Sequence, residues 1–335
     1  MQIMIVVKID FDGFWLNFNK YDNIFIHLLR KRFEVVVDEK KPDFIFYSCF
    51  QPDYSRDAIK IFYTGENCRV DFNRFDYGIG YDYLSFGDRY MRWPLYRLYG
   101  SLFDDVLTKV KDPEQILAVK TGFCTFVYTN AHYADPIREL FFKRLSEYKG
   151  VASGGRAFNN VGGPVNDKMA FIRDYKFNIA FENAEAPGYT TEKLVEAMAA
   201  ETLPIYWGNP CVEKEFNLKS FIQLKSEKDI DKVIEKIVKI DQNDDLYIDM
   251  MSEKWVDSEK ENHVLESELL DFFENIFKQG PAQAARITKY GFNTDSLDPE
   301  SIRKELKKRK SKAFKENNIV IKPIRRIVRS LQGKD

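Results

Sequence analysis

Short apolar segments alternate with helical patterns along most of the chain, and this alternation constrains the fold more than any other feature. Segments with the length and composition of buried strands lie at 3–7, 33–37, 43–47, 60–63, 123–128, 177–181 and 203–207. Helical spacing of apolar residues lies at 21–32, 136–148, 192–200, 228–239 and 265–278. The alternation restarts after Lys111-Asp112-Pro113, so it predicts two α/β units.

The length of the chain agrees with two domains. It has 335 residues, more than the roughly 250–300 at which a single hydrophobic core stops growing. We predict a first domain at 1–112, a second at 113–300 and a tail at 301–335. The last helix of the second segment is a candidate to pack back on the first domain.

Charge separates the tail from the rest of the chain. Residues 301–335 hold 13 Lys and Arg against three Asp and Glu, whereas the whole chain has a net charge of −1. A near-neutral chain is not expected to bind nucleic acid. Beyond Pro323, one helical face carries apolar residues, which are Ile324, Ile327, Val328 and Leu331. This basic amphipathic pattern is typical of a segment on an anionic membrane surface, and a solvated, disordered tail is the alternative.

The cysteines and histidines form no recognisable metal or disulfide pattern. The four Cys (49, 68, 124 and 211) lack CxxC spacing, which favours free thiols in a reducing compartment. The three His are scattered, so a His-based metal site is not expected. The apolar run at 3–7 is too short for a signal segment or a membrane span. We expect a cytoplasmic protein, with peripheral contact to the inner face of a membrane only through 301–335.

The segment at 175–210 carries most of the chemical information. A buried-type strand ends at Glu182-Asn183, and a loop then leads into Tyr189-Thr190-Thr191-Glu192-Lys193, where a helix begins. Backbone N–H groups at a helix start attract phosphate, and Lys193 adds a positive charge there. Glu192 is suited to accept hydrogen bonds from ribose hydroxyls. From these residues alone, an ordinary solvated Glu-Lys pair is the plainer interpretation.

The run FENAEAPGYTTEKLVEAMAAETLPIYWGNP resembles the signature of the α-1,3/4-fucosyltransferases, glycosyltransferase family 10, especially its bacterial members. Further similarity lies in FYTGEN (62–67), FDYGIG (75–80) and RWPLY (92–96), in the same order. The resemblance implies the GT-B architecture, an α/β fold with two Rossmann-like domains facing a cleft. It also implies inverting transfer of L-fucose from GDP-fucose. The expected acceptor is the 3-OH of GlcNAc in N-acetyllactosamine- or lactose-type glycans, which gives a Lewis x product.

The resemblance also assigns roles to individual residues. Glu66 matches the catalytic base, which takes the proton from the acceptor hydroxyl. Arg138 matches the arginine that binds the diphosphate, and Lys193 would complete that clamp. The donor-binding positions implied in this way are Arg138, Asn183, Tyr189, Glu192 and Lys193. Ser153-Gly154-Gly155-Arg156 resembles the glycine turn of the family, or is only a turn.

Two further patterns bear on metal and acceptor binding. Asp10-Phe11-Asp12 and Asp229-Ile230-Asp231 have the spacing of a metal-binding DxD motif, which arises by chance in a chain with 52 Asp and Glu. Since two cations can take the place of a metal at a diphosphate, we predict no obligatory cofactor and at most a stimulatory divalent cation. Trp15, beside Phe14, is a candidate stacking platform for an acceptor sugar, with packing at the rim as the alternative.

Two other functions would use the same residues. A glycoside hydrolase would employ Glu66 and Glu192 as a carboxylate pair and would need no diphosphate clamp. Arg138 and Lys193 therefore discriminate between this interpretation and a transferase. A non-catalytic, membrane-associated protein that binds sugar nucleotides would not need Glu66.

Overall fold

The computed structural model describes residues 4–129, 134–257 and 266–287, together with positions 304, 307, 308 and 311. The chain divides into two compact units. One comprises Met1–Val70 and Phe75–Arg286, and the other comprises Asp71–Arg74 and Ile287–Asp335. Most of the basic tail lies outside the described residues, so its amphipathic helix stays a prediction. The fold and the site below belong to the first unit.

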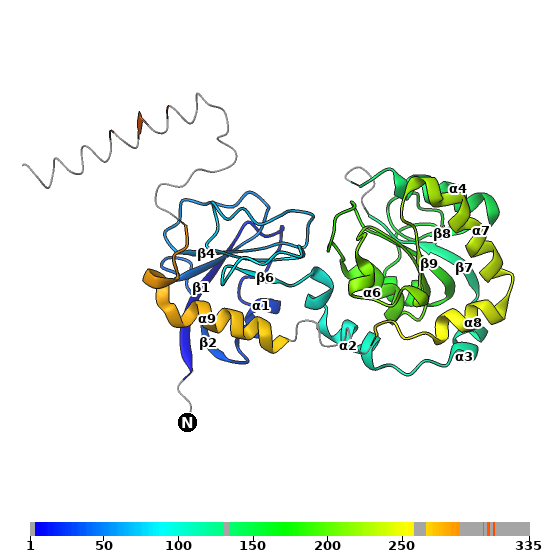
Figure 1. Ribbon diagram of the computed structural model, residues 1–335, viewed down its shortest axis with the longest axis horizontal. Helices are drawn as coiled ribbons and strands as arrows, with labels where there is room; N and C mark the ends of the chain where they lie inside the picture. The colour runs from blue at the N-terminus through cyan, green and yellow to red at the C-terminus, as the bar shows by residue number, and fades with distance from the viewer. Residues whose placement is uncertain are drawn as a thin grey trace, which may run out of the picture. The chain divides into compact units, whose positions relative to one another are not determined.

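The N-terminal half of this unit forms a six-stranded parallel sheet in the order β2-β1-β3-β4-β5-β6 (Figure 1). Its strands are β1 (Ile5–Asp12), β2 (Phe33–Val37), β3 (Phe44–Tyr47), β4 (Ile59–Tyr63), β5 (Tyr77–Gly80) and β6 (Tyr90–Arg92). The helices that accompany it are α1 (Ile24–Leu29) and α9 (Glu266–Ala284), whereas η1 (Leu95–Leu98) and α2 (Gly100–Thr108) lead on from β6 to the second half. Because all neighbours are parallel, the strands end at the same edge of the sheet.

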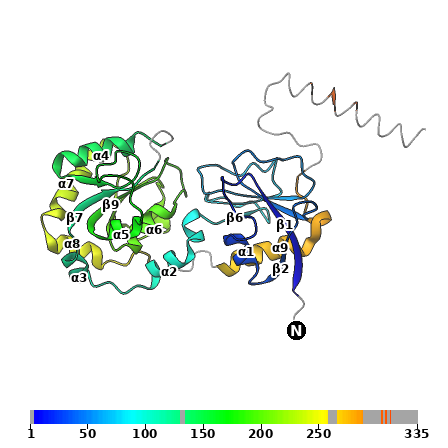
Figure 2. The same cartoon turned by 180° about the vertical axis from the view of Figure 1, so that it is seen from behind.

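The C-terminal half forms a five-stranded parallel sheet in the order β11-β10-β9-β7-β8. Its strands are β7 (Gly122–Phe126), β8 (Val151–Ser153), β9 (Tyr175–Phe181), β10 (Leu203–Trp207) and β11 (Ile222–Gln223). The helices are α3 (Pro113–Ala118), α4 (Ile137–Tyr148), α5 (Lys168–Arg173), α6 (Glu192–Ala199), α7 (Ile230–Asp241) and α8 (Asp244–Ser252). The helices α4 and α7 lie side by side (Figures 1 and 2). The predicted α/β class is thus confirmed, with two parallel sheets.

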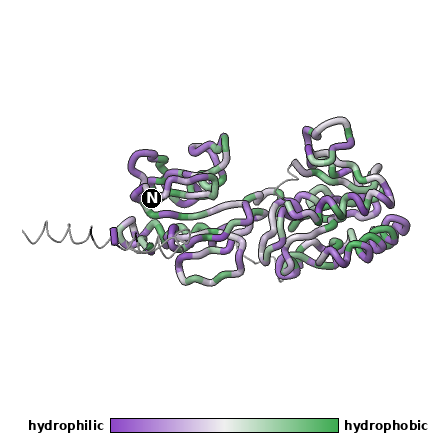
Figure 3. The backbone as a smooth tube through the Cα atoms, turned by 90° about the horizontal axis from the view of Figure 1, so that it is seen from above, coloured by the Kyte–Doolittle hydropathy of each residue, from purple (hydrophilic) through white to green (hydrophobic). Residues whose placement is uncertain are grey.

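Local sequence explains where several helices begin. The Asn23 side chain accepts hydrogen bonds from the first N–H groups of α1, and Asp112 caps α3, in which Pro113 occupies the first turn. Along the helices, hydrophobic residues alternate with hydrophilic ones (Figure 3), so each helix can pack one face on a sheet. No helix in the described part of the chain is long and apolar enough to cross a membrane.

Strand β1 extends further than the apolar run predicted. It continues to Asp12, and therefore includes Lys8 and Asp10. Asp10 is buried but forms ion pairs with Lys20 (2.9 Å) and Arg56 (2.5 Å), which compensate its charge. The prediction ended the strand too early because it treated these charged residues as solvated.

The core of the first sheet includes a helix from the far end of the chain. Aromatic rings of α9 contact rings of the sheet: Phe277 lies 5.2 Å from Phe33 and 4.7 Å from Phe44, and Phe273 lies 5.5 Å from Phe46. Figure 1 shows α9 in orange across this sheet. In contrast, Phe103 and Val106 of α2 pack in the core of the second sheet. The domain limits at residues 112 and 300 stay predictions.

Candidate functional site

Glu66 lies in the loop that follows β4 in the first sheet. Its side chain is exposed, and its backbone N–H donates a hydrogen bond to Thr64 Oγ1 (3.2 Å). Cys68 N–H closes the turn by donating to the Glu66 carbonyl (2.7 Å). A Cβ at Gly65 would come within 2.9 Å of the end of the Leu95 side chain, so glycine lets the loop approach η1 without moving that side chain. The predicted base therefore projects from a short, fixed turn.

Arg138 lies near the start of α4, beside the carboxyl ends of β7 and β9. These strands are neighbours at the point where the strand order reverses, which is where open α/β sheets bind ligands. The guanidinium is buried (4% exposed), stacks 3.6 Å above the Tyr128 ring and donates a hydrogen bond to Asn183 Oδ1 (2.8 Å). Among the described residues, no carboxylate forms an ion pair with it. A buried arginine without an anionic partner points to an anionic ligand.

Lys193 lies in the first turn of α6, between two carboxylates. Its Nζ donates to Thr191 Oγ1 (2.8 Å) and Glu192 Oε1 (3.1 Å), and lies 3.4 Å from Glu182 Oε2. Burial acts to lower the pKa of Lys193, but the charges of Glu182 and Glu192 outweigh it and raise that pKa above its ordinary value. Lys193 is therefore a fixed cation at this helix start.

Glu182 is a residue of the site to which the sequence analysis gave no role. It is fully buried directly after β9, where its carboxylate accepts hydrogen bonds from the backbone N–H (2.7 Å) and hydroxyl (2.6 Å) of Thr191. A Cβ at Gly208 would lie 2.3 Å from Glu182 Cγ, so the glycine after β10 makes room for this side chain. Glu182 thus fixes the helix start that carries Lys193. No local pattern in the sequence marks this residue, because its role comes from its burial in the tertiary structure.

Tyr189 connects the loop before α6 with the loop that carries Glu66. Its hydroxyl lies 3.5 Å from the Gly65 carbonyl oxygen, and its ring packs on Tyr81 with the centroids 5.0 Å apart. Arg92 supports this contact by donating to the carbonyls of Tyr81 (2.9 Å) and Gly188 (3.3 Å). The structure therefore places the predicted base beside the predicted donor-binding loop.

Two predicted features, Trp15 and the DxD patterns, are not part of the group of site residues described above. The Trp15 side chain is 56% exposed, and its ring contacts are with Phe14 (5.8 Å) and Phe18 (5.0 Å) rather than with the other predicted site residues. In the DxD patterns, Asp10 is engaged by the two cations already described, and Asp231 forms an ion pair with Arg144 (2.5 Å). Within the described ranges, no group of three or more His, Cys, Asp or Glu is arranged to hold a metal ion.

The pKa of Glu192 bears on the alternative that the protein is a glycoside hydrolase. A glycoside hydrolase needs one carboxyl group whose pKa is raised, so that it can act as the general acid. Burial acts to raise the pKa of Glu192, but Lys193 reverses this, and the pKa lies below its ordinary value. This ion-paired carboxylate is better suited to accept hydrogen bonds than to donate a proton.

A steric prediction follows for the glycine turn after β8. A Cβ at Gly155 would lie 2.0 Å from the carbonyl oxygen of Tyr128, the residue on which Arg138 stacks. We expect Gly155→Ala to lower the free energy of unfolding by about 1–3 kcal/mol, the usual cost of overpacking. Urea unfolding followed by circular dichroism measures this. Gly150→Ala is the control, because a Cβ there meets nothing within 4 Å. Equal midpoints for the two variants would contradict the steric argument.

Two family models match the chain. The model described as the alpha-(1,3)-fucosyltransferase FucT N-terminal domain matches residues 9–99, and that of the glycosyltransferase family 10 (fucosyltransferase) C-terminal part matches residues 117–273. The first match includes Glu66, and the second includes Arg138 and Lys193. Both sheets therefore resemble parts of the same kind of protein.

Individual relatives agree with these models. The chain is 37% identical over 228 residues to the alpha-(1,3)-fucosyltransferase FucT of Helicobacter pylori, covering 59% of this chain and 47% of that protein. A putative fucosyltransferase of Acanthamoeba polyphaga mimivirus is 31% identical over 216 residues, covering 61% of this chain and 34% of that protein. The chain thus spans about half or less of the length of these relatives.

Solved structures match over most of the chain. A crystal structure of an alpha1,3-fucosyltransferase with GDP-fucose has a TM-score of 0.72 at 29% identity, covering 88% of this chain and 95% of that one. A crystal structure of an alpha1,3-fucosyltransferase with GDP has a TM-score of 0.71 at 31% identity, covering 83% and 92%. These matches confirm the GT-B fold that the motifs implied.

Proposed function

The chain belongs to glycosyltransferase family 10, the fucosyltransferases, and from this premise we propose that it transfers L-fucose from GDP-fucose to a glycan acceptor. The expected acceptor is the 3-OH of GlcNAc in N-acetyllactosamine- or lactose-type glycans, with a Lewis x product. Support comes from the two family models and from similar proteins that were crystallised with GDP and with GDP-fucose.

One observation carries the donor assignment, namely that Arg138 is buried and has no carboxylate partner among the residues that the structure describes. A diphosphate would supply the missing anion, and the planar guanidinium suits two of its oxygens. Lys193 would supply the second cation from the start of α6. Asn183 holds Arg138 in place through its side-chain oxygen (2.8 Å), so we assign it an orienting role.

The proposed reaction is a single displacement with inversion. Glu66 takes the proton from the acceptor hydroxyl, whose oxygen forms the new bond to the anomeric carbon of fucose while the bond to the diphosphate breaks. The electron pair of that bond leaves with GDP, and Arg138 and Lys193 stabilise the negative charge that develops there. Since these cations would meet the diphosphate, we propose no obligatory metal, with a divalent cation at most stimulatory.

Two further side chains are assigned to the donor. Glu192, an ion-paired carboxylate, would accept hydrogen bonds from the ribose hydroxyls. Tyr189 is proposed to line the donor where fucose meets the base, and its contact with the loop of Glu66 supports this role. Trp15 remains a candidate acceptor platform, supported only by its exposed ring.

A donor and acceptor screen tests this function. We would incubate the protein with GDP-fucose, or with other nucleotide sugars, and with N-acetyllactosamine, lactose and type 1 chains, and detect products by mass spectrometry. A product heavier by one fucose, formed from GDP-fucose and N-acetyllactosamine, is expected. Hydrolysis of glycans without a nucleotide sugar would favour the hydrolase, and GDP-fucose binding without any product would favour the non-catalytic alternative.

The basic tail gives a separate prediction about membranes. We expect deletion of 301–335 to leave an active enzyme and to weaken sedimentation with anionic vesicles, because each Lys or Arg near the surface contributes about 1 kcal/mol. Added salt should weaken binding of the full chain in the same way. Vesicle sedimentation of both forms, with neutral vesicles as the control, measures this. Equal, salt-insensitive sedimentation, or loss of activity on deletion, would show that the tail has a structural role.

A further inference from the structure

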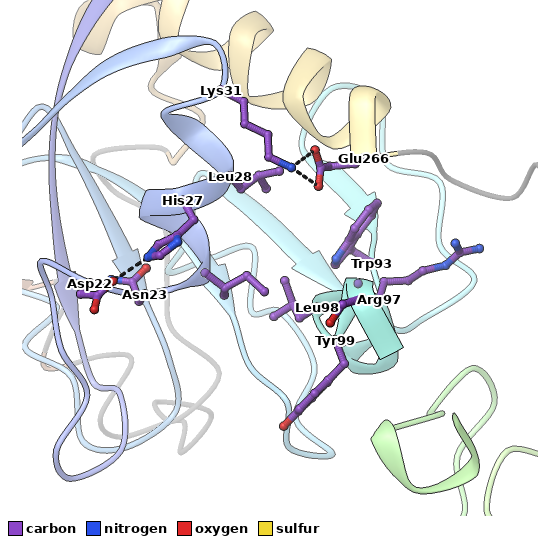
Figure 4. A pocket seen from close by; sticks show the side chains of 13 residues that line it. Asp22, Asn23, His27, Leu28, Lys31, Trp93, Arg97, Leu98, Tyr99 and Glu266 are labelled. Atoms are coloured by element: carbon purple, nitrogen blue, oxygen red, sulfur yellow. Dashed lines mark hydrogen bonds and ion pairs between the residues drawn. The ribbon is translucent and has the colours of Figure 1, made fainter. Parts of the chain in front are cut away.

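A cavity of about 540 Å³ lies in the first unit beside the first sheet, apart from the cations of the donor site (Figure 4). It is formed by α1, the segment from Trp93 to Ser101 and the first residue of α9. Its volume is within the range of about 300–1,000 Å³ that small-molecule sites occupy. No role in the proposed transfer has been given to any residue that lines it.

Trp93 provides the clearest sign of a ligand. The residue is only 5% exposed and lines the cavity. Its backbone N–H donates to the Gly80 carbonyl (2.7 Å), but its indole Nε1–H has no hydrogen-bond partner in the part of the chain that the structure describes. Buried donors are nearly always paired, so this N–H is suited to an oxygen that a ligand supplies.

The charges around the cavity indicate a neutral ligand. Lys31 Nζ forms an ion pair with the Glu266 carboxylate (2.6 and 2.8 Å), and His27 Nε2 lies 2.6 Å from Asp22 Oδ1 (Figure 4). Arg97 also lines the cavity, so Lys31 and Arg97 balance the carboxylates of Asp22 and Glu266, and neither positive nor negative charge dominates the rim. Paired carboxylates still accept hydrogen bonds from hydroxyl groups. A highly charged ligand such as a nucleoside diphosphate would find no excess of positive charge here.

The remaining wall has the character that suits a sugar ring. Leu28 and Leu98 contribute apolar surface, and Tyr99 and Trp93 contribute aromatic rings. A pyranose presents C–H groups on one face and hydroxyls at its edge, so it matches a wall that is apolar on one side and carries a donor and acceptors at the rim.

The segment that lines the cavity also contacts the loop of the proposed catalytic base. Leu95, between Trp93 and Leu98 in the same segment, packs against Gly65, the residue before Glu66. When an acceptor glycan presents one hydroxyl to Glu66, the sugar residues next to the reacting one would lie toward this cavity.

We propose that this cavity binds a neutral sugar residue of the acceptor glycan, adjacent to the residue that receives fucose, and that Trp93 Nε1 donates a hydrogen bond to one of its hydroxyls. This inference rests on the proposed function for the identity of the acceptor. It adds a site that determines which glycans are used, and it makes Trp93 and the rim of the cavity responsible for acceptor affinity rather than for donor binding.

Trp93→Phe tests the hydrogen bond because it keeps an aromatic ring and removes the N–H. We expect the KM for N-acetyllactosamine to rise roughly 2- to 12-fold, the worth of one neutral hydrogen bond. The KM for GDP-fucose and the Kd for GDP should stay at the wild-type values. Trp255→Phe is the matched control, since Trp255 is equally buried but belongs to the core of the second sheet. An unchanged acceptor KM in Trp93→Phe would overturn the role of its N–H.

Ser101→Trp provides a second test that does not disturb the core. Ser101 is exposed at the start of α2, and a large ring there would occupy the cavity. We expect saturation-transfer NMR signals of N-acetyllactosamine, recorded with GDP present, to be lost in this variant while GDP affinity is kept. Undiminished signals would overturn the site. If the wild-type protein yields no fucosylated product, the proposed function has failed, and the NMR comparison then decides the cavity alone.

Discussion

Replacement of Glu66 by glutamine is expected to slow fucose transfer by about 10²- to 10⁴-fold, the usual contribution of a positioned general base. Glutamine has nearly the same shape but cannot accept the proton of the acceptor hydroxyl. The Glu66 side chain is exposed and its loop is held by backbone contacts with Thr64 and Cys68, so the substitution should leave the fold intact. Initial rates with GDP-fucose and N-acetyllactosamine measure the loss.

Two comparisons make the Glu66 result specific. GDP affinity measured by calorimetry should be unchanged in Glu66→Gln, because the diphosphate is assigned to other residues. Glu114→Gln, an exposed change of the same kind in α3, should transfer fucose at the wild-type rate. Near-normal turnover in Glu66→Gln would remove this residue from the mechanism.

The second large effect is expected on donor affinity. Lys193→Ala and Arg138→Ala each remove one cation from the proposed diphosphate site, and hydrogen bonds to charged groups contribute about 1.5–3 kcal/mol. The Kd for GDP should therefore rise by about 10- to 150-fold in each variant. Isothermal titration calorimetry with GDP and with GDP-fucose measures this, and acceptor binding should be kept.

The control for these variants must distinguish the loss of a contact with GDP from the loss of the folded structure. Lys232→Ala removes the same charge from an exposed position on α7 and should bind GDP like the wild-type protein. Lys193→Ala also deprives the buried Glu182 of its nearest cation, so circular dichroism must show that it is folded at the temperature of the titration. A folded Lys193→Ala or Arg138→Ala variant with unchanged GDP affinity would disprove the assignment of that residue to the clamp.

Two strands, β2 and β10, have the limits that the sequence predicted. Every residue of β10 is buried, and a parallel strand in a covered sheet is a nearly continuous apolar run. In contrast, β2 is a partly exposed edge strand, and its three valines give it a strong β-propensity. Strand β5 was not predicted because its four residues include two glycines, and β6, β8 and β11 have three residues or fewer. Segments of this kind become strands because they pair with neighbouring strands, and a local sequence pattern carries no information about that pairing.

Residues of the site were predictable from the sequence where the residue type is unusual for its local position. A lysine in the first turn of a helix is unusual, and Lys193 could be singled out for that reason. Glu182 could not, because its importance comes from burial between Thr191 and the close approach of Gly208, which is a property of the tertiary structure. Trp93 is a similar case: only the tertiary structure shows that its buried indole N–H has no partner among the described residues and that the residue lines a cavity.

The packing of α9 on the first sheet has a consequence for how the protein is made. Phe33, Phe44 and Phe46 are synthesised before the second sheet, whereas their partners Phe273 and Phe277 are synthesised after the whole of it. Until then the nascent first sheet presents an uncovered aromatic surface, which is the kind of surface that chaperones bind and that aggregates. The half of the protein that is translated first is therefore the half that finishes folding last.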